Sequence, residues 1–166
     1  MITTKTNIEQ KLDKEISILF KHSLVFGKDN PIKNRLTYAQ FISNKMLIIA
    51  AIKNGIPFSL FKVIKLYTPF SENDWADFLN ISTKSLQRYR QSARNFKPIQ
   101  SEKIIEIAEV TNIGLDVFGD LIKFKLWLDT PNFPLGNLKP FELLKHSYGK
   151  ELVIGELTRI NYGILV

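Results

Sequence analysis

Proline and glycine divide the last third of this sequence at short intervals, and that spacing limits the fold more than any other feature. Pro131, Pro134 and Pro140 exclude one continuous helix, because proline lacks an amide hydrogen and clashes with the preceding helical turn. Gly136 and Asn137 lie between them and are residue types that accept a positive φ in a tight turn. This part of the chain is therefore predicted to form short helices and turns that make a rigid, irregular platform.

Elsewhere, apolar residues recur every three or four positions, which is the period of an amphipathic helix. The predicted helices cover residues 7–20, 38–53, 58–67, 71–79, 83–93, 101–110, 121–128 and 149–160, and residues 115–118 either extend or follow the helix that starts at 101. The third of these also has the β-branched and aromatic content of a strand, but its spacing and its helical neighbours favour a helix. The candidate buried positions of the second helix are Phe41, Ile42, Met46, Ile49 and Ile52. The expected fold class is all-α, with a helix-turn-helix core packed on the small C-terminal platform.

Residues 71–93 have the pattern of a helix-turn-helix. Ser71 is placed to cap a helix with acidic residues in its first turn, residues 80–82 form a short turn, and Thr83 opens a second, basic helix. The second helix is predicted to bury Leu86 and either Tyr89 or Ala93. Any two helices that meet at a corner use similar residue types, so the pattern alone also fits a purely structural corner.

The positive charge of the chain is unevenly distributed. The formal net charge is +7, and residues 1–70 hold 11 Lys and Arg against 4 Asp and Glu, residues 71–98 hold 5 against 3, and residues 99–166 hold 7 against 9. Five bases and no acid lie between Ser82 and Pro98. Such a run fits an ordinary solvated face, and it also fits a surface that contacts nucleic-acid phosphates.

The sequence offers little for catalysis. It has no cysteine, and His22 and His146 have no neighbours at the spacing of metal ligands, so we expect no catalytic residues, no metal and no cofactor. Asp129 is expected to cap the turn that follows it rather than to pair with Glu142 as a catalytic carboxylate. The longest apolar run, Met46 to Ile52, is far too short to cross a membrane, so we expect a soluble cytoplasmic protein.

Two segments of the last third carry a family resemblance. WLDTPNFPLGNLKPFELL, which begins at Trp127, and RINYGI, which begins at Arg159, resemble the toxin-binding domain of Xre/MbcA/ParS-type antitoxins. The resemblance extends more weakly upstream through the helix-turn-helix to about residue 43. It implies a DNA-binding region over residues 43–98 and a toxin-binding domain over residues 99–166. Residues 1–42 are not part of the resemblance, and their apolar spacing predicts an N-terminal helical extension. Asn80 and Asn137 stand where the family usually has glycine, and asparagine is the mildest such replacement.

The resemblance implies an antitoxin that neutralises a RES-domain toxin, which consumes NAD, and that represses its own operon by binding operator DNA. We also expect a homodimer, because one helix-turn-helix buries little DNA surface and operators are commonly bound by symmetric pairs. The residues assigned to DNA are Thr83, Lys84, Ser85, Gln87, Arg88, Arg90 and Arg94. Those assigned to the toxin are Trp127, Pro131, Asn132, Arg159, Asn161, Tyr162, Gly163 and Ile164.

Other interpretations of the sequence stay open. Ile160 and Tyr162 fit residues that close the protein's own core, with Arg159 as a solvated cation at the helix end. The whole chain also fits a stand-alone helix-turn-helix transcriptional regulator with a C-terminal interaction domain. An enzyme is a distant third, because no catalytic set is present.

Overall fold

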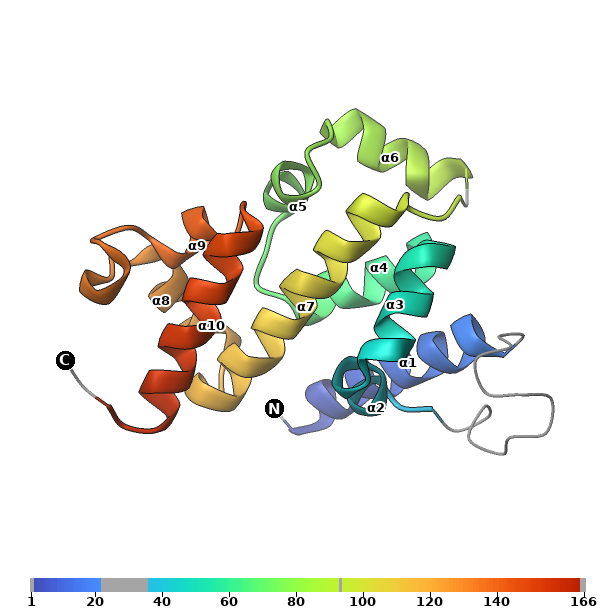
Figure 1. Ribbon diagram of the computed structural model, residues 1–166. Helices are drawn as coiled ribbons and strands as arrows, with labels where there is room; N and C mark the ends of the chain where they lie inside the picture. The colour runs from blue at the N-terminus through green and yellow to red at the C-terminus, as the bar shows by residue number, and fades with distance from the viewer. Residues whose placement is uncertain (1, 22–35, 93, 165–166) are drawn as a thin grey trace. The chain divides into compact units, whose positions relative to one another are not determined.

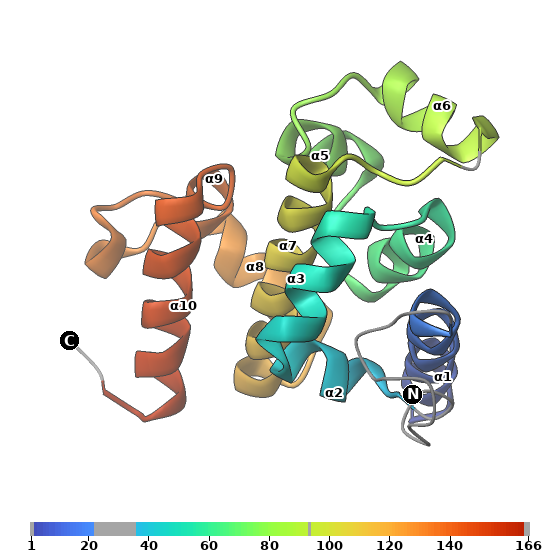
Figure 2. The ribbon, with the colours of Figure 1, turned by 45° about the vertical axis from the view of Figure 1, so that its right-hand side comes forward.

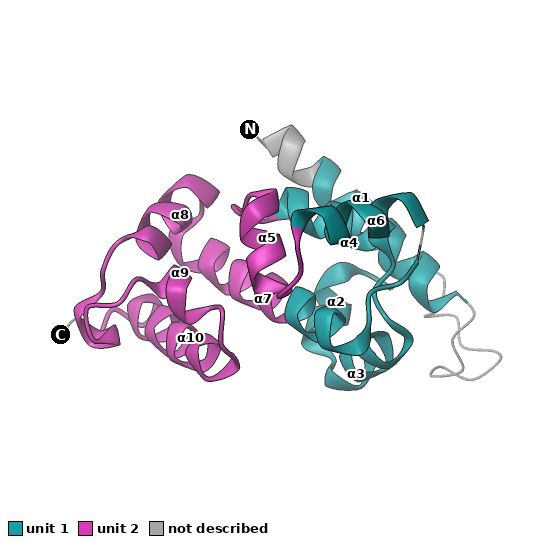
Figure 3. Cartoon of the chain, turned by 90° about the horizontal axis from the view of Figure 1, so that it is seen from above, with its two compact units in different colours: residues 1–67, 83–105 teal, residues 68–82, 106–166 magenta. Residues whose placement is uncertain are grey.

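A computed structural model describes residues 2–21, 36–92 and 94–164, with side chains from residue 7 onward (Figure 1). Within these ranges every regular element is a helix, apart from one isolated bridge between Asn132 and Leu138. The predicted all-α fold class is confirmed. The chain forms two compact units: unit 1 is residues 1–67 and 83–105, and unit 2 is residues 68–82 and 106–166 (Figure 3).

The helices are divided between the two units. Those of unit 1 are α1 (Ile2–Phe20), α2 (Tyr38–Ser43), α3 (Lys45–Asn54), α4 (Phe58–Tyr67) and α6 (Thr83–Ser92). Those of unit 2 are α5 (Glu72–Phe78), α8 (Leu121–Asp129), the 3-10 turn η3 (Phe133–Leu135), α9 (Pro140–Leu143) and α10 (Ser147–Asn161). The long helix α7 (Pro98–Phe118) starts in unit 1 and continues into unit 2.

In unit 1, α1 packs along α4 and also contacts α2 (Figures 1 and 2). Leu12, Ile16 and Phe20 recur every four residues of α1, and all three are buried. The Tyr38 amide donates a hydrogen bond of 2.7 Å to Oδ1 of Asp13, which ties α1 to the start of α2. The N-terminal segment is therefore part of the core of unit 1.

The predicted single helix over residues 38–53 is wrong, because Asn44 divides it into α2 and α3. Asn44 has an extended backbone, and its side-chain oxygen accepts hydrogen bonds from the amides of Met46 and Leu47, which caps α3. The break shifts the helical phase, so the predicted core positions Met46 and Ile49 are exposed. The residues of α3 that are buried instead are Leu47, Ile48 and Ala51.

The predicted helix start at Ser101 is also wrong. Helix α7 begins at Pro98, since proline suits a first turn in which amide hydrogens have no partner within the helix. Ser101 lies one turn further on and is fully buried. Its hydroxyl forms hydrogen bonds with Ile56 and Phe96, in two neighbouring loops, instead of capping a helix.

An aromatic cluster joins α5 to α9 within unit 2. The ring centroid of Phe70 is 5.0 Å from that of Phe78 and 6.1 Å from that of Phe141, and Trp75 packs edge-on against Phe78. Ser71 and Asp74 form a capping box at the start of α5, as the position of the serine predicts. The first helix of the helix-turn-helix thus shares a core with the C-terminal platform.

Close backbone approaches fix the helices of unit 2 at two glycines. A Cβ atom on Gly114 of α7 would lie 2.4 Å from the ring of Phe124 in α8. One on Gly149 of α10 would lie 2.0 Å from the carbonyl oxygen of Leu143 in α9. At Gly155, further along α10, a Cβ atom would meet nothing within 4 Å. Gly149 is therefore required by packing, whereas Gly155 is not required by any internal contact of the described chain.

This contrast predicts opposite effects for the same substitution in one helix. Gly149→Ala should lower the free energy of unfolding by about 1–3 kcal/mol, because the backbone of α9 has no room for the methyl group. Gly155→Ala should raise it by about 0.5–1 kcal/mol, because alanine loses less backbone entropy than glycine in a helix. Urea unfolding of the two variants measures both effects, and equal changes in the two would contradict the packing described for α9 and α10.

Candidate nucleic-acid interface and partner-binding surface

The polar face of α6 lies on the surface of unit 1. Leu86 is buried, and six of the seven residues assigned to DNA from the sequence are exposed, with Ser85 half-buried. The exposed six are Thr83, Lys84, Gln87, Arg88, Arg90 and Arg94. None of the four cations among them forms an ion pair with a described residue. Ala93, the alternative buried position, lies outside the described residues.

The turn before α6 is set by a left-handed residue at the end of α5. Asn80 has φ of 51°, its amide bonds the carbonyl of Asp77, and the Ile81 amide bonds the carbonyl of Ala76. These two hydrogen bonds make a Schellman motif, which stops a helix when a residue accepts the left-handed conformation. Asparagine thus takes the place of glycine here, as its tolerance for this conformation predicts.

The C-terminal end of α6 is held by Phe96. The rings of Tyr89 and Phe96 stack with centroids 4.3 Å apart, and Phe61 of α4 packs edge-on against Phe96 at 5.0 Å. The Phe96 amide donates a hydrogen bond of 2.8 Å to the carbonyl of Ile56, in the turn between α3 and α4. Phe96 therefore links the C-terminal end of α6 to α4 within unit 1.

The α3–α4 turn is closed by Gly55 and Ser101. Gly55 has φ of 79°, and a Cβ atom there would lie 2.3 Å from the Phe96 carbonyl oxygen, so no other residue type fits. The Ser101 hydroxyl accepts a hydrogen bond of 2.8 Å from the Ile56 amide and donates one of 3.2 Å to the Phe96 carbonyl. One buried hydroxyl therefore forms hydrogen bonds with the α3–α4 turn, at Ile56, and with the loop between α6 and α7, at Phe96.

In unit 2, residues 132–138 close a tight hairpin. The Asn132 amide bonds the Leu138 carbonyl, and the Asn132 carbonyl accepts from the amides of Leu135 and Asn137. Gly136 and Asn137 have φ of 71° and 61°, as the sequence predicts. The side-chain oxygen of Asn132 is buried and has no hydrogen-bond partner among the described residues.

The other platform residues assigned to the toxin differ in exposure. Trp127 is half-buried against Phe118 and Phe124, so it packs α8 on α7, while Pro131 is exposed. The prediction that Asp129 caps the following turn is wrong. Its carboxylate pairs with Lys125 at 2.8 Å, and Thr130 takes the cap position instead.

The tail after α10 consists of residues 162–164 and is folded back by a second Schellman motif. Gly163 has φ of 67°, its amide bonds the Ile160 carbonyl, and the Ile164 amide bonds the Arg159 carbonyl. The Arg159 guanidinium lies 3.1 Å from the buried Glu156 carboxylate and donates to the Ile164 carbonyl oxygen. Asn161 is exposed, and Tyr162 and Ile164 expose 75% and 56% of their surface, so Tyr162 does not close the core.

Sequence reasoning missed several exposed apolar side chains of unit 2. They are Ile122 and Leu126 on α8, Phe133 and Leu138 at the hairpin, and Tyr148 and Leu152 on α10. From the sequence, both Leu152 and Val153 fit the buried face of α10. Two adjacent apolar residues do not show which of them faces the core. The spacing of Tyr148, Leu152 and Tyr162 was the available signal, since these positions share one helical face.

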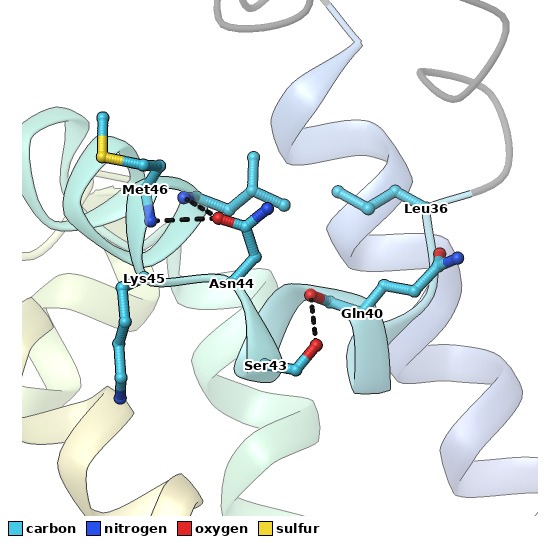
Figure 4. A pocket seen from close by; sticks show the side chains of 7 residues that line it. Leu36, Gln40, Ser43, Asn44, Lys45 and Met46 are labelled. Carbon is cyan, nitrogen blue, oxygen red and sulfur yellow. Dashed lines mark hydrogen bonds between the residues drawn. The ribbon is translucent and has the colours of Figure 1, made fainter.

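Other candidate sites are weak. A hollow of about 500 Å³ lies beside α2 and α3 and is lined by Leu36, Gln40, Ser43, Asn44, Lys45, Met46 and Leu47 (Figure 4). Its Asn44 oxygen caps α3, and its Ser43 hydroxyl donates to the Gln40 carbonyl, so these polar groups serve helix ends. Among the described residues there is no cluster of three potential metal ligands and no helix that is long and apolar enough to cross a membrane. His22 lies outside these residues, and His146 is exposed.

Two protein families match this chain, and the matched residues include most of both candidate surfaces. Residues 47–109 match the family model of the antitoxin Xre-like helix-turn-helix domain. Residues 114–163 match that of the antitoxin Xre/MbcA/ParS C-terminal toxin-binding domain. A curated relative from Yersinia enterocolitica, described as "Antitoxin Xre", is 28% identical over 123 residues, which is 74% of this chain and 83% of that protein.

The hydroxyl network at the α3–α4 turn gives a testable prediction. Ser101→Ala removes the partners of the Ile56 amide and the Phe96 carbonyl, and should lower the free energy of unfolding by about 1–3 kcal/mol. Ser59→Ala is the matched control, because Ser59 lies on the exposed surface of α4 in the same unit. Denaturant unfolding of both variants measures the difference, and an equal effect would contradict the role given to Ser101.

Proposed function

This chain belongs to the Xre-type antitoxins, with a helix-turn-helix domain and a C-terminal toxin-binding domain, and from that premise we propose that its partner is a RES-family toxin that consumes NAD. The chain itself is not an enzyme. In the proposed function it acts in the cytoplasm as a homodimer, neutralises the toxin through the C-terminal part and represses its own operon through the helix-turn-helix. The functional parts are residues 1–42 as an extension, 43–98 for DNA and 99–166 for the toxin.

Four cations on and directly after α6, which have no ion pair with a described residue, support the assignment of DNA binding to this helix. Lys84, Arg88, Arg90 and Arg94 are exposed, and phosphate contacts by such cations release counterions, which is the main source of affinity for DNA. Gln87 lies between them on the same exposed helix. A glutamine of this kind binds adenine through two hydrogen bonds, and an arginine such as Arg88 binds guanine in the same way.

Substitution of these residues separates affinity from specificity. Arg90→Ala with Arg94→Ala should weaken binding to all DNA sequences and reduce the slope of log affinity against log salt by about 2, because two phosphates of the DNA would no longer be neutralised by an arginine. Gln87→Ala should instead cost about 1–3 kcal/mol of discrimination at one base pair. Fluorescence anisotropy with DNA from the chain's own promoter measures both quantities at several salt concentrations.

Lys123→Ala is the matched control for the charge change, because Lys123 is an exposed cation on α8 in unit 2. We expect it to leave DNA affinity unchanged. Operator affinity that stayed the same in the Arg90→Ala, Arg94→Ala double variant would show that α6 is the wrong helix.

The exposed side chains of the tail support the assignment of toxin binding to the C-terminal part of the chain. Tyr162 and Ile164 present apolar surface to solvent at a position where Arg159 and Gly163 hold the backbone in a defined turn. An ordered, exposed aromatic residue has little rotamer entropy to lose on binding, and such residues dominate binding energy at protein interfaces. The tail is thus suited to enter a pocket of the toxin, which in the proposed function is its NAD site.

A chain that ends at Asn161 tests the tail without removing the pair of Arg159 with the buried Glu156. This truncation should abolish protection of cells that express the toxin, while DNA affinity and the melting temperature stay close to those of the full chain. Gly163→Trp should have much of the same effect, because it disturbs the turn and blocks close approach. A truncated chain that still protects cells would contradict the assignment, as would one that fails only because it has unfolded.

A further inference from the structure

The exposed face of α10 carries a continuous stripe that the tail extends. Its members are spaced at intervals of four, three, four and three residues, so they lie along one side of the helix. They are Tyr148, Leu152, Gly155, Arg159 and Tyr162. Tyr148 and Leu152 expose 85% and 56% of their surface. Val153 and Leu157, on the opposite side, are buried. The stripe is therefore an outer face of unit 2 with no covering element in the described chain.

Glycine in the middle of this face has no internal explanation. Gly155 has helical neighbours on both sides, where glycine is the least favourable residue apart from proline. Its conformation is helical, and a Cβ atom would meet no atom within 4 Å apart from its chain neighbours and the backbone of its own helix. The other helical glycines, Gly114 and Gly149, are both required by close contacts within unit 2. No contact of the described chain accounts for Gly155, and the α10 backbone is open to close approach by a partner at this position.

We infer that this stripe is a helix-packing surface, and that an α-helix of the toxin lies along α10 and crosses it at Gly155. The spacing of four and three residues is that of a face on which two helices pack with nearly parallel or antiparallel axes. From Tyr148 to Tyr162 the stripe is about 21 Å long, which suits a partner helix of about four turns. The absence of a side chain at Gly155 allows the two backbones to come closer there than elsewhere.

The toxin is favoured as the occupant by the position of the stripe. All five residues lie within residues 114–163, the part of the chain that matches a toxin-binding domain. The stripe also runs directly into the tail at Tyr162, so one partner would contact both surfaces. The apolar pair Ile122 and Leu126 on α8 spans only about one helical turn, and it has no such continuity with the tail. The inference rests on the proposed function, because it takes the toxin as the partner.

The test increases the side-chain volume at Gly155 while it preserves the free chain. Gly155→Ala should raise the melting temperature by roughly 1–4 °C, and Gly155→Leu should leave it no lower than that of the wild type. Affinity for the toxin should nevertheless fall with side-chain volume, by at least about tenfold for leucine. The probe is the purified product of the toxin gene adjacent to this chain's own gene, with affinity measured by surface plasmon resonance.

Asp116→Leu is the matched control, because it adds leucine to an exposed position of α7 in the same unit and should leave toxin affinity unchanged. If Gly155→Leu binds the toxin as tightly as the wild type does, the inference is overturned and the proposed function stands. If the wild-type chain does not bind this toxin at all, both fail. If sedimentation without toxin shows that Gly155→Leu turns a dimer into a monomer, the occupant is a second copy of this chain and the inference is overturned.

Discussion

Both candidate surfaces depend on residues that adopt the left-handed conformation at the ends of helices. Asn80 ends α5 and directs the chain into α6, and Gly163 ends α10 and folds back the tail. At each, the two amides that follow the helix bond carbonyls of its last turn, so the stop is a defined structure and not a frayed end. The chain therefore leaves both α5 and α10 through a defined turn.

The two matched domains share more structure than their boundaries along the sequence suggest. Helix α5 falls within the matched helix-turn-helix domain, yet Trp75 and Phe78 pack in a cluster with Phe141 of the toxin-binding domain. Lys145 and Asp77 add an ion pair between the same two parts at 3.5 Å. The first helix of the helix-turn-helix is therefore anchored in unit 2, while α6 is anchored in unit 1 by the stacking of Tyr89 on Phe96.

The sequence predicted helix ends and turns that single residues determine. Predictions were wrong where a residue's position depends on contacts with a distant part of the chain. The helix stop at Asn80, the turn at Gly136 and the cap at Ser71 follow from conformational preferences of single residues. Ser101 looks like a cap in the sequence, and only the loop around Ile56, 45 residues away, explains why it is buried inside a helix. Asn44 also has a local role as a cap, but it competes with a helical apolar pattern that continues on both sides.

The same distinction applies to the candidate sites. The basic residues of α6 were identified from the sequence because charge and exposure go together on a polar helix. The face of α10 was not, since apolar residues such as Tyr148 and Leu152 are ordinarily assigned to a core. Only the observed burial of Val153 and Leu157 decides which side of the helix faces outward.

Ion pairing explains why the two surfaces suit partners of different chemistry. In unit 2, Lys125, Lys145, Lys150 and Arg159 each lie within 4 Å of a carboxylate, and the pair of Lys150 with Glu109 is largely buried at 3.0 Å. Cations that already have a partner contribute little net attraction to a polyanion. The contacts proposed for α10 and the tail would therefore rely on apolar area and shape. The cations of α6 have no acidic partner among the described residues, and their field is therefore available to phosphates. If the two proposed assignments hold, a rise in salt concentration lowers the affinity of α6 for DNA and leaves the affinity of the α10 face for the toxin nearly unchanged.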